Sequence, residues 1–292
     1  MASTYNINST FKLNSGYEIP RLGFGVRIPR PPEGTQKACL EALKLGYRHI
    51  DSAASYRNEA GVGDALRASG IPRSEIFFTS KVPPAVVRGG YEATKQQIER
   101  SLKTAGVDFL DLMLIHAPYG GSAARKDAWK ALVEGVEEGK LRSIGISNYG
   151  VHHLDELEQH IAELKAERGN GGVISVGQYE IHPWCARNDI IDWCAKRNIA
   201  CEAYSPVVQG ARWGDKTLVK IAEKHGKTEA QILIRWSLQK GLIPLPKSVT
   251  PSRIKENAEL YGFELSSDDM AELETTEYAP VCWDPVKSDL DS

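Results

Sequence analysis

Eight short apolar runs alternate with longer amphipathic stretches along this chain, and the alternation limits the folds that it can adopt. The runs have the length of buried strands, and the stretches between them have the apolar spacing of helices. Alternating strands and helices predict parallel strands joined by right-handed crossovers. The predicted strands are residues 21–26, 47–53, 76–82, 110–117, 141–147, 173–180, 199–205 and 242–248.

Eight strand–helix units that close on themselves form a (β/α)8 TIM barrel of the α/β class. The chain has 292 residues, which suits one such barrel. We therefore predict a single barrel domain over residues 1–292. The predicted helices are Thr35–Leu45, Asn58–Ala68, Tyr91–Ala105, Ala123–Glu138, Val151–Glu167, Arg187–Arg197, Lys216–Lys224, Thr228–Gln239 and Pro251–Glu259.

The two ends of the chain do not fit the alternation. Two short extended pieces flank Asn14-Ser15-Gly16 and predict a β-hairpin at about residues 10–20, which would plug the N-terminal end of the barrel. The segment at about residues 276–292 is predicted to be an irregular tail.

A doubly wound open sheet would also alternate strands and helices. It would bind a dinucleotide through a G-x-G-x-x-G motif after the first strand. The first predicted strand offers Gly23 and Gly25, but no third glycine follows and no helix begins there. The barrel is therefore favoured over the open sheet.

Composition excludes several classes of function. The formal net charge is −2 and there is no basic stripe, so we expect no nucleic-acid partner. No apolar run is long enough to span a membrane, and the first ten residues lack the apolar centre of a signal peptide. The five cysteines have no CxxC spacing and no metal-ligand cluster accompanies them. We expect a cytoplasmic protein with free thiols and no metal.

Four side chains stand out against the apolar runs. Asp51, Lys81 and His116 lie near the C-terminal ends of three successive predicted strands, and Tyr56 follows in the loop after the first of them. Active sites of (β/α)8 barrels lie at the C-terminal ends of the strands, so all four should meet at one mouth. Any one of them alone would more often be structural. Burying the charged groups of Asp51 and Lys81 costs free energy unless they pair with each other, so their joint occurrence indicates a functional site.

These residue types suit proton transfer to a carbonyl oxygen. A phenol has a pKa of roughly 10, and a neighbouring ammonium stabilises its ionised form. We expect Lys81 to lower the pKa of Tyr56, Asp51 to hold Lys81, and His116 to orient a carbonyl group.

Several segments resemble the aldo-keto reductase superfamily. They are GYRHIDSAASYRNE (46–59), Lys81, His116, ISNYG (146–150) and IPLPKSVTPSRIKEN (243–257), within a resemblance that spans roughly Leu13 to Leu273. The resemblance implies a barrel that binds NADPH/NADP+ without a Rossmann domain and reduces small carbonyl compounds to alcohols. It implies Tyr56 as proton donor, assisted by Lys81, Asp51 and His116. It also implies a monomer.

The resemblance extends to the cofactor site. Ser147, Asn148 and Gln178 match the residues that bind the nicotinamide amide, Tyr204 matches the residue that stacks on the ring, and Ser205 matches the residue beside the pyrophosphate. The matches for the adenosine end are Lys247, Ser248, Thr250, Arg253 and Asn257. Lys247 and Arg253 also place two cations beside the start of a helix, which favours an anion such as the 2′-phosphate of NADPH.

The expected substrate mouth departs from the family pattern. Aromatic residues are expected there, but the matching positions hold Arg27, Pro83 and Ala117. We expect a wider and more polar mouth in which Arg27 meets an anionic or hydroxylated substrate, or simply faces solvent. Trp213, in the loop of residues 206–215, could replace part of the aromatic wall or cover the cofactor.

Two other functions stay open at this point. The same site could run in reverse as an alcohol dehydrogenase. The chain could instead be a catalytically silent NADP(H)-binding regulatory subunit. However, the four residues expected to transfer the proton, here called the relay residues, are all present: Asp51, Tyr56, Lys81 and His116.

Overall fold

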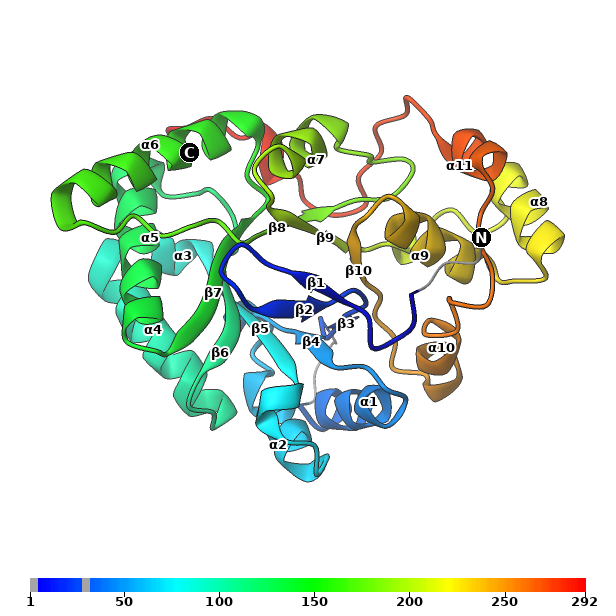
Figure 1. Cartoon of the computed structure of the whole chain (residues 1–292), viewed down its shortest axis with the longest axis horizontal. Helices are drawn as coiled ribbons and strands as arrows, with labels where there is room; N and C mark the ends of the chain where they lie inside the picture. The colour runs from blue at the N-terminus through cyan, green and yellow to red at the C-terminus, as the bar shows by residue number, and fades with distance from the viewer. Residues whose placement is uncertain (1–4, 28–31) are drawn as a thin grey trace.

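The computed structural model describes residues 5–27 and 32–292, and its eight-stranded parallel sheet is rolled into a ring enclosed by helices (Figure 1). Neighbouring strands follow chain order from β3 to β10. The (β/α)8 barrel prediction is confirmed. The strands are β3 Phe24–Gly25, β4 His49–Asp51, β5 Phe77–Val82, β6 Leu110–Ile115, β7 Leu141–Ser147, β8 Val176–Glu180, β9 Ala200–Tyr204 and β10 Ile243–Leu245.

Two backbone hydrogen bonds close the ring between its first and last strands. Gly23 N donates to Pro244 O at 3.1 Å, and Gly25 N donates to Pro246 O at 3.0 Å. A Cβ atom on Gly23 would lie only 2.4 Å from the Cδ2 of Leu245. Glycine at this position therefore leaves room for the Leu245 side chain. The open-sheet alternative is wrong.

Helices cover the outside of the ring (Figure 1). Most begin and end within three residues of the predicted positions. The helices are α1 Pro32–Lys44, α2 Glu59–Ala68, α3 Pro84–Val87, α4 Gly90–Ala105, α5 Gly121–Glu137, α6 Val151–Arg168, α7 Asn188–Ala195, α8 Lys216–His225, α9 Glu229–Gln239, α10 Pro251–Glu256 and α11 Ser267–Leu273. Short 3-10 turns are η1 Ala54–Tyr56, η2 Arg73–Glu75, η3 Val208–Gly210 and η4 Pro285–Lys287.

Two of these helices, α3 and α11, were not predicted. Helix α11 begins with a reciprocal pair of bonds: Asp269 N donates to the Ser266 hydroxyl at 3.2 Å, and Ser266 N donates to the Asp269 carboxylate at 2.9 Å. A serine three residues before an acidic residue is a helix-start pattern, so the sequence did contain this signal. Helix α3 spans four residues and is too short for periodicity to predict.

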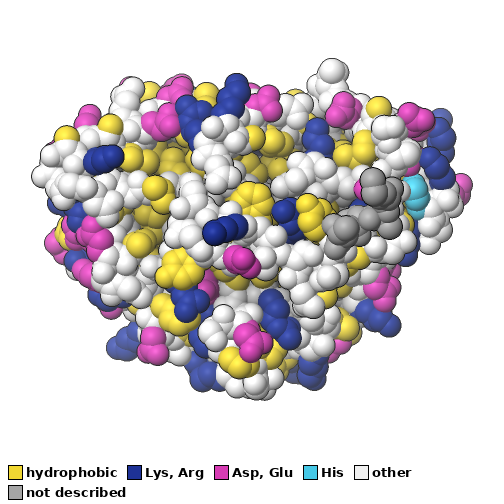
Figure 2. All heavy atoms as spheres, viewed as in Figure 1, with side chains coloured by type: hydrophobic (Ala, Val, Ile, Leu, Met, Phe, Trp, Pro, Cys, Tyr) yellow, Lys and Arg dark blue, Asp and Glu magenta, His cyan; other side chains and the backbone are white. Residues whose placement is uncertain are grey.

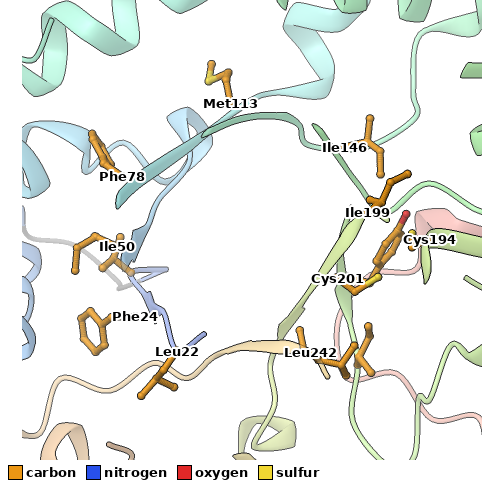
Figure 3. Close-up of a cluster of buried hydrophobic side chains, with 14 of the residues drawn as sticks. Leu22, Phe24, Ile50, Phe78, Met113, Ile146, Cys194, Ile199, Cys201 and Leu242 are labelled. Atoms are coloured by element: carbon orange, nitrogen blue, oxygen red, sulfur yellow. The ribbon is translucent and has the colours of Figure 1, made fainter. Parts of the chain in front are cut away.

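The side chains of each strand alternate between the helices and the inside of the barrel. Ile50, Phe78, Met113 and Ile146 point outward from the ring in Figure 3 and belong to the large apolar core beneath the helices. Their neighbours along each strand therefore point inward. Because of this alternation, only every second residue of a strand can extend a polar side chain toward the barrel axis.

The predicted hairpin consists of β1 (Thr10–Lys12) and β2 (Glu18–Pro20), which pair antiparallel. It lies across one end of the ring (Figure 1). Leu13 and Ile19 are buried there in a second, smaller apolar cluster that includes Phe77 from inside the barrel. The hairpin therefore plugs the N-terminal end, as predicted, and leaves the other end for the site.

Basic and acidic side chains are interspersed over the face shown in Figure 2. Within residues 5–27 and 32–292, no helix is both long and apolar enough to cross a membrane. Residues 1–4 and 28–31 of the predicted domain lie outside the described residues, including the start of the segment used to judge the signal peptide. That the whole chain is one domain stays a prediction.

Candidate active site

The C-terminal ends of β4, β5 and β6 bring three polar side chains together at one end of the barrel. Asp51 is the last residue of β4, Lys81 lies one residue before the end of β5, and His116 directly follows β6. These strands are neighbours, so the three side chains meet at the open end of the barrel. The turn η1 follows β4 and places Tyr56 beside them.

Lys81 and Asp51 form a buried ion pair. The Lys81 Nζ donates to the two Asp51 carboxylate oxygens, at 2.8 and 2.7 Å, and to the Ser52 carbonyl at 2.7 Å. Their side chains are 0% and 6% exposed. Burial acts to lower the pKa of Lys81, but the Asp51 carboxylate, together with Tyr56 and Glu202, acts to raise it, and the net direction is upward. Lys81 is therefore a fixed ammonium ion at neutral pH.

Tyr56 lies close to this ammonium without a hydrogen bond to it. The Lys81 Nζ is 5.4 Å from the centroid of the Tyr56 ring, and its three protons are directed to Asp51 and Ser52. Burial raises the pKa of Tyr56, whereas Lys81 lowers it, and the net direction is upward. We expected a lowered pKa, but burial dominates here. The phenol is therefore protonated at neutral pH, the state that a proton donor requires.

His116 completes the group. Its ring centroid lies 5.7 Å from that of Tyr56, and the two ring planes are 74° apart. Burial and the charge of Lys81 lower the pKa of His116 to about 3. The imidazole is therefore uncharged at neutral pH and keeps one N–H donor.

A cavity of about 1550 Å³ opens at this end of the barrel and runs from Tyr56 to α10. Nine of the ten predicted cofactor residues line it, namely Asn148, Gln178, Tyr204, Ser205, Lys247, Ser248, Thr250, Arg253 and Asn257. The tenth, Ser147, is buried beside it, and its hydroxyl donates to the Gln178 carbonyl at 2.9 Å. The structure therefore brings the predicted cofactor set and the four relay residues together.

Hydrogen bonds join three of the predicted cofactor residues, Asn148, Gln178 and Tyr204, to Asp51 and His116. The Asn148 Nδ2 donates to the His116 carbonyl at 2.9 Å, and the Tyr204 hydroxyl donates to the Asn148 Oδ1 at 2.8 Å. The Gln178 Nε2 donates to the Asp51 Oδ2 at 2.8 Å. A molecule held by these amides would therefore lie next to Tyr56 and His116.

The outer end of the cavity is cationic. Lys247 follows β10, and Arg253 lies on α10. Both side chains are exposed, and neither forms an ion pair with any part of the chain that the structure describes. Ser248 lies between them in the chain, and its hydroxyl accepts a hydrogen bond from Thr250 N at 3.1 Å. Two free cations beside a cavity suit a phosphate group.

Only two of the four residues predicted for the substrate pocket line the cavity. Arg27 and Trp213 line the cavity, whereas Pro83 and Ala117 are not among the residues that line it. Ala117 is fully buried and follows His116, beyond the last residue of β6. Pro83 is the N-cap residue of α3, where the chain leaves the barrel wall.

The C-terminal tail supplies an aromatic residue that was not predicted for the mouth. Trp283 lines the cavity, with ring centroids 6.2 Å from His116 and 5.8 Å from Tyr119. The Glu180 carboxylate holds this part of the tail, because it accepts two backbone N–H groups from residues 281 and 282 at 2.6 and 3.0 Å. These partners lie about a hundred residues apart in the chain, so no local pattern could reveal the contact.

A buried carboxyl group beneath the site was also missed. The Gln178 Nε2 donates to the Glu202 Oε2 at 2.6 Å, inside the barrel. Glu202 is the one acidic residue in the apolar run IACEAYS. A charged residue in such a run needs a partner when it is buried, and this was the signal available in the sequence.

All five cysteines are free thiols. Across the described ranges, no group of three or more His, Cys, Asp or Glu side chains could hold a metal ion.

Comparison with known proteins identifies the family of this chain. A family model described as the Aldo/keto reductase family matches residues 23–277. The glyoxal reductase of Bacillus subtilis (strain 168) is 42% identical over 270 residues, covering 92% of this chain and 93% of that protein. An aldo/keto reductase structure from Brucella melitensis is 40% identical with a TM-score of 0.81, covering 91% of this chain and 98% of that chain. A mutant of Gox0644 in complex with NADPH is 36% identical with a TM-score of 0.83, covering 96% and 98%. The chain therefore belongs to the aldo/keto reductase family.

Proposed function

We propose that this protein reduces aldehydes or ketones to alcohols with NADPH, and that Tyr56 is the proton donor. The observation that carries the proposal is the buried Lys81–Asp51 pair beneath Tyr56 and His116, at the inner end of a cavity with two free cations at its outer end. Membership of the aldo/keto reductase family supports an oxidoreductase, and the NADPH complex of a mutant of Gox0644 supports the cofactor.

The residues of the cavity fit NADPH. The side chains of Asn148 and Gln178 offer amide groups for the nicotinamide carboxamide, and the Tyr204 ring offers a stacking surface. Lys247 and Arg253 offer two cations to the 2′-phosphate that distinguishes NADPH from NADH. When bound, NADPH supplies the hydride that reduces the carbonyl carbon.

The relay residues would then transfer a proton to the carbonyl oxygen of the substrate. Negative charge develops on the carbonyl oxygen as the carbon is reduced, and the Tyr56 hydroxyl gives its proton to that oxygen. The Lys81 ammonium stabilises the phenolate that remains. The uncharged His116 donates a hydrogen bond that orients the carbonyl group.

The protonation state of Tyr56 bears on the direction of the reaction. Reduction needs the phenol, whereas alcohol oxidation needs the phenolate as a base. Because the pKa of Tyr56 is raised, the phenol predominates at neutral pH. The site therefore supplies the proton that reduction needs, while the ratio of NADPH to NADP+ sets the net direction of the reaction.

The first test is cofactor consumption with an aldehyde panel. We expect NADPH oxidation, followed by absorbance, with para-nitrobenzaldehyde and with glyoxal, which the name of the Bacillus relative suggests. We expect kcat/KM for NADPH to exceed that for NADH at least about tenfold, because charge-assisted contacts to a phosphate contribute roughly 1.5–3 kcal/mol each. NADPH binding without turnover over the whole panel would support a silent regulatory subunit instead.

Two variants on α10 sharpen this test. Arg253→Ala should raise KM for NADPH about tenfold, by loss of one charge-assisted contact, and leave KM for NADH unchanged. Lys255→Ala is the matched control, because Lys255 is a cation on the same helix that pairs with Glu259 at 3.8 Å and does not line the cavity. Equal or better kcat/KM with NADH would contradict the cofactor assignment.

Arg27 gives the substrate mouth an unusual charge. It lines the cavity, is exposed, and forms no ion pair within the described part of the chain. Tyr56 and His116 line the same cavity, and the charge of Arg27 acts to lower the pKa values of both. We propose that it binds an anionic group on the substrate.

Substrates of equal shape and different charge test this role. Para-carboxybenzaldehyde and para-nitrobenzaldehyde are close in shape, and only the first is anionic. Arg27→Ala should lower kcat/KM for the carboxylated aldehyde about tenfold relative to the nitro compound, the effect of one charge-assisted contact. Arg27→Lys should keep part of the preference. An unchanged ratio in Arg27→Ala would show that Arg27 only faces solvent.

A further inference from the structure

A second carboxyl group lies below the relay, closer to the middle of the barrel. Glu202 and His49 are both 0% exposed. The Glu202 Oε2 accepts a hydrogen bond from the Gln178 Nε2 at 2.6 Å, and the same Nε2 donates to the Asp51 Oδ2 at 2.8 Å. The Glu202 Oε1 lies 3.4 Å from the His49 Nε2 and has no hydrogen-bond partner in the described part of the chain.

The charges around Glu202 do not balance if it is ionised. The polar and titratable groups that face it are His49 and Asp51 from β4, Lys81 from β5 and Gln178 from β8, whereas β10 places the apolar Ile243 beside it. Lys81 is the one cation in this set, and its three protons go to Asp51 and Ser52. An ionised Glu202 would therefore be a buried carboxylate with no cation of its own, which is costly.

A proton removes this cost. Burial and the neighbouring Asp51 charge raise the pKa of Glu202 to about 8, and burial together with Lys81 lowers the pKa of His49 to about 3. At neutral pH the two groups are therefore an uncharged acid and an uncharged imidazole. The acid proton would sit on the Oε1, the oxygen that otherwise lacks a partner; it faces the His49 Nε2, which also lies 3.1 Å from the Thr79 hydroxyl.

We propose that Glu202 is a positioning residue that stays protonated at neutral pH, holds Gln178 against Asp51, and leaves the charge of Lys81 to act on Tyr56. The effect of Glu202 on proton transfer from Tyr56 rests on the proposed function, whereas its protonation state does not. If Glu202 loses its proton, a second carboxylate competes with the phenolate for Lys81. Transfer of the Tyr56 proton then becomes less favourable. Glu202 touches neither substrate nor cofactor in this role.

Infrared spectroscopy tests the protonation state without requiring turnover. The wild-type protein should show the carbonyl stretch of a protonated carboxylic acid at neutral pH. That band should disappear as the pH rises through about 8 and should be absent from Glu202→Gln. Glu59→Gln is the matched control, because Glu59 is another buried glutamate, bonded to Ser80 outside the barrel interior, and its loss should leave this titrating band in place.

The pH dependence of kcat gives the functional readout. Glutamine imitates the protonated acid, so Glu202→Gln should reduce para-nitrobenzaldehyde within about threefold of the wild-type rate at neutral pH. Wild-type kcat should fall by at least about threefold above the pKa of Glu202, and the variant should lack this step. Tyr56 titrates at higher pH, because its pKa is raised above that of a free phenol, so the two steps separate.

These experiments distinguish failure of the inference about Glu202 from failure of the proposed function. An inactive wild-type protein would contradict the reductase proposal, while the infrared titration would still report on Glu202. A wild-type protein without the band at neutral pH, or a band titrating through about 8 that persists in Glu202→Gln, would overturn the inference about Glu202. So would a loss of more than about tenfold in kcat of the variant at neutral pH, because the ionised form would then be the active one.

Discussion

Replacing Tyr56 with Phe is expected to lower kcat for aldehyde reduction by about 10²- to 10⁴-fold, the usual contribution of a positioned general acid. Phe keeps the ring, and so keeps the edge contact with His116, but it removes the proton that would go to the carbonyl oxygen. The Kd for NADPH should not change, because the proposed cofactor contacts come from other residues. We would measure kcat by NADPH absorbance and Kd by quenching of protein fluorescence.

Tyr261→Phe is the matched control for this variant. Burial also raises the pKa of Tyr261, to about 12, but this residue does not line the cavity. The Tyr261→Phe variant should therefore reduce aldehydes at the wild-type rate. If Tyr56→Phe kept more than about a tenth of the wild-type kcat, the proton would have to come from another group and our assignment would be wrong.

Much of the fold could be predicted because its signals are local. Each strand is an apolar run that is buried on both faces, and each crossover helix has its own apolar face. The relay could be placed because parallel strands in a barrel put their C-terminal ends at one mouth. Asp51, Lys81 and His116 therefore meet whatever the loops do. Gly23, which belongs to the incomplete dinucleotide-binding motif, lies where the first and last strands of the barrel meet.

The parts that could not be predicted depend on distant contacts or on burial. Trp283 reaches the mouth because Glu180 holds the tail, and nothing in the local sequence of either residue indicates the other. The pKa of Tyr56 rises because the cost of burial exceeds the effect of Lys81, and the sequence does not give the extent of burial. Ala117 is fully buried just beyond the end of β6 and does not line the cavity, and the sequence does not give this burial.

Replacing Lys81 with Met is expected to destabilise the fold and to abolish most of the activity. Removing one partner of a buried ion pair typically costs about 3–5 kcal/mol, because the remaining charge stays buried. Here the remaining group is the Asp51 carboxylate, whose side chain is 6% exposed. Among the side chains that the structure describes, only that of Gln178 would still donate a hydrogen bond to it. Urea unfolding would give the change in free energy, and single-turnover NADPH oxidation would give the rate of the chemical step.

The double variant Asp51→Asn/Lys81→Met separates the two effects of Lys81. It removes both charges, so we expect it to recover much of the free energy of unfolding that the single variant loses, because no carboxylate is left without its cation. It should not recover the rate of reduction, since neither Met nor Asn can stabilise the Tyr56 phenolate. A single variant as stable as the wild type would mean that Asp51 finds another partner or takes up a proton. A double variant that regained the wild-type rate would mean that the charge of Lys81 does not act on Tyr56, and that its role at the end of β5 is structural.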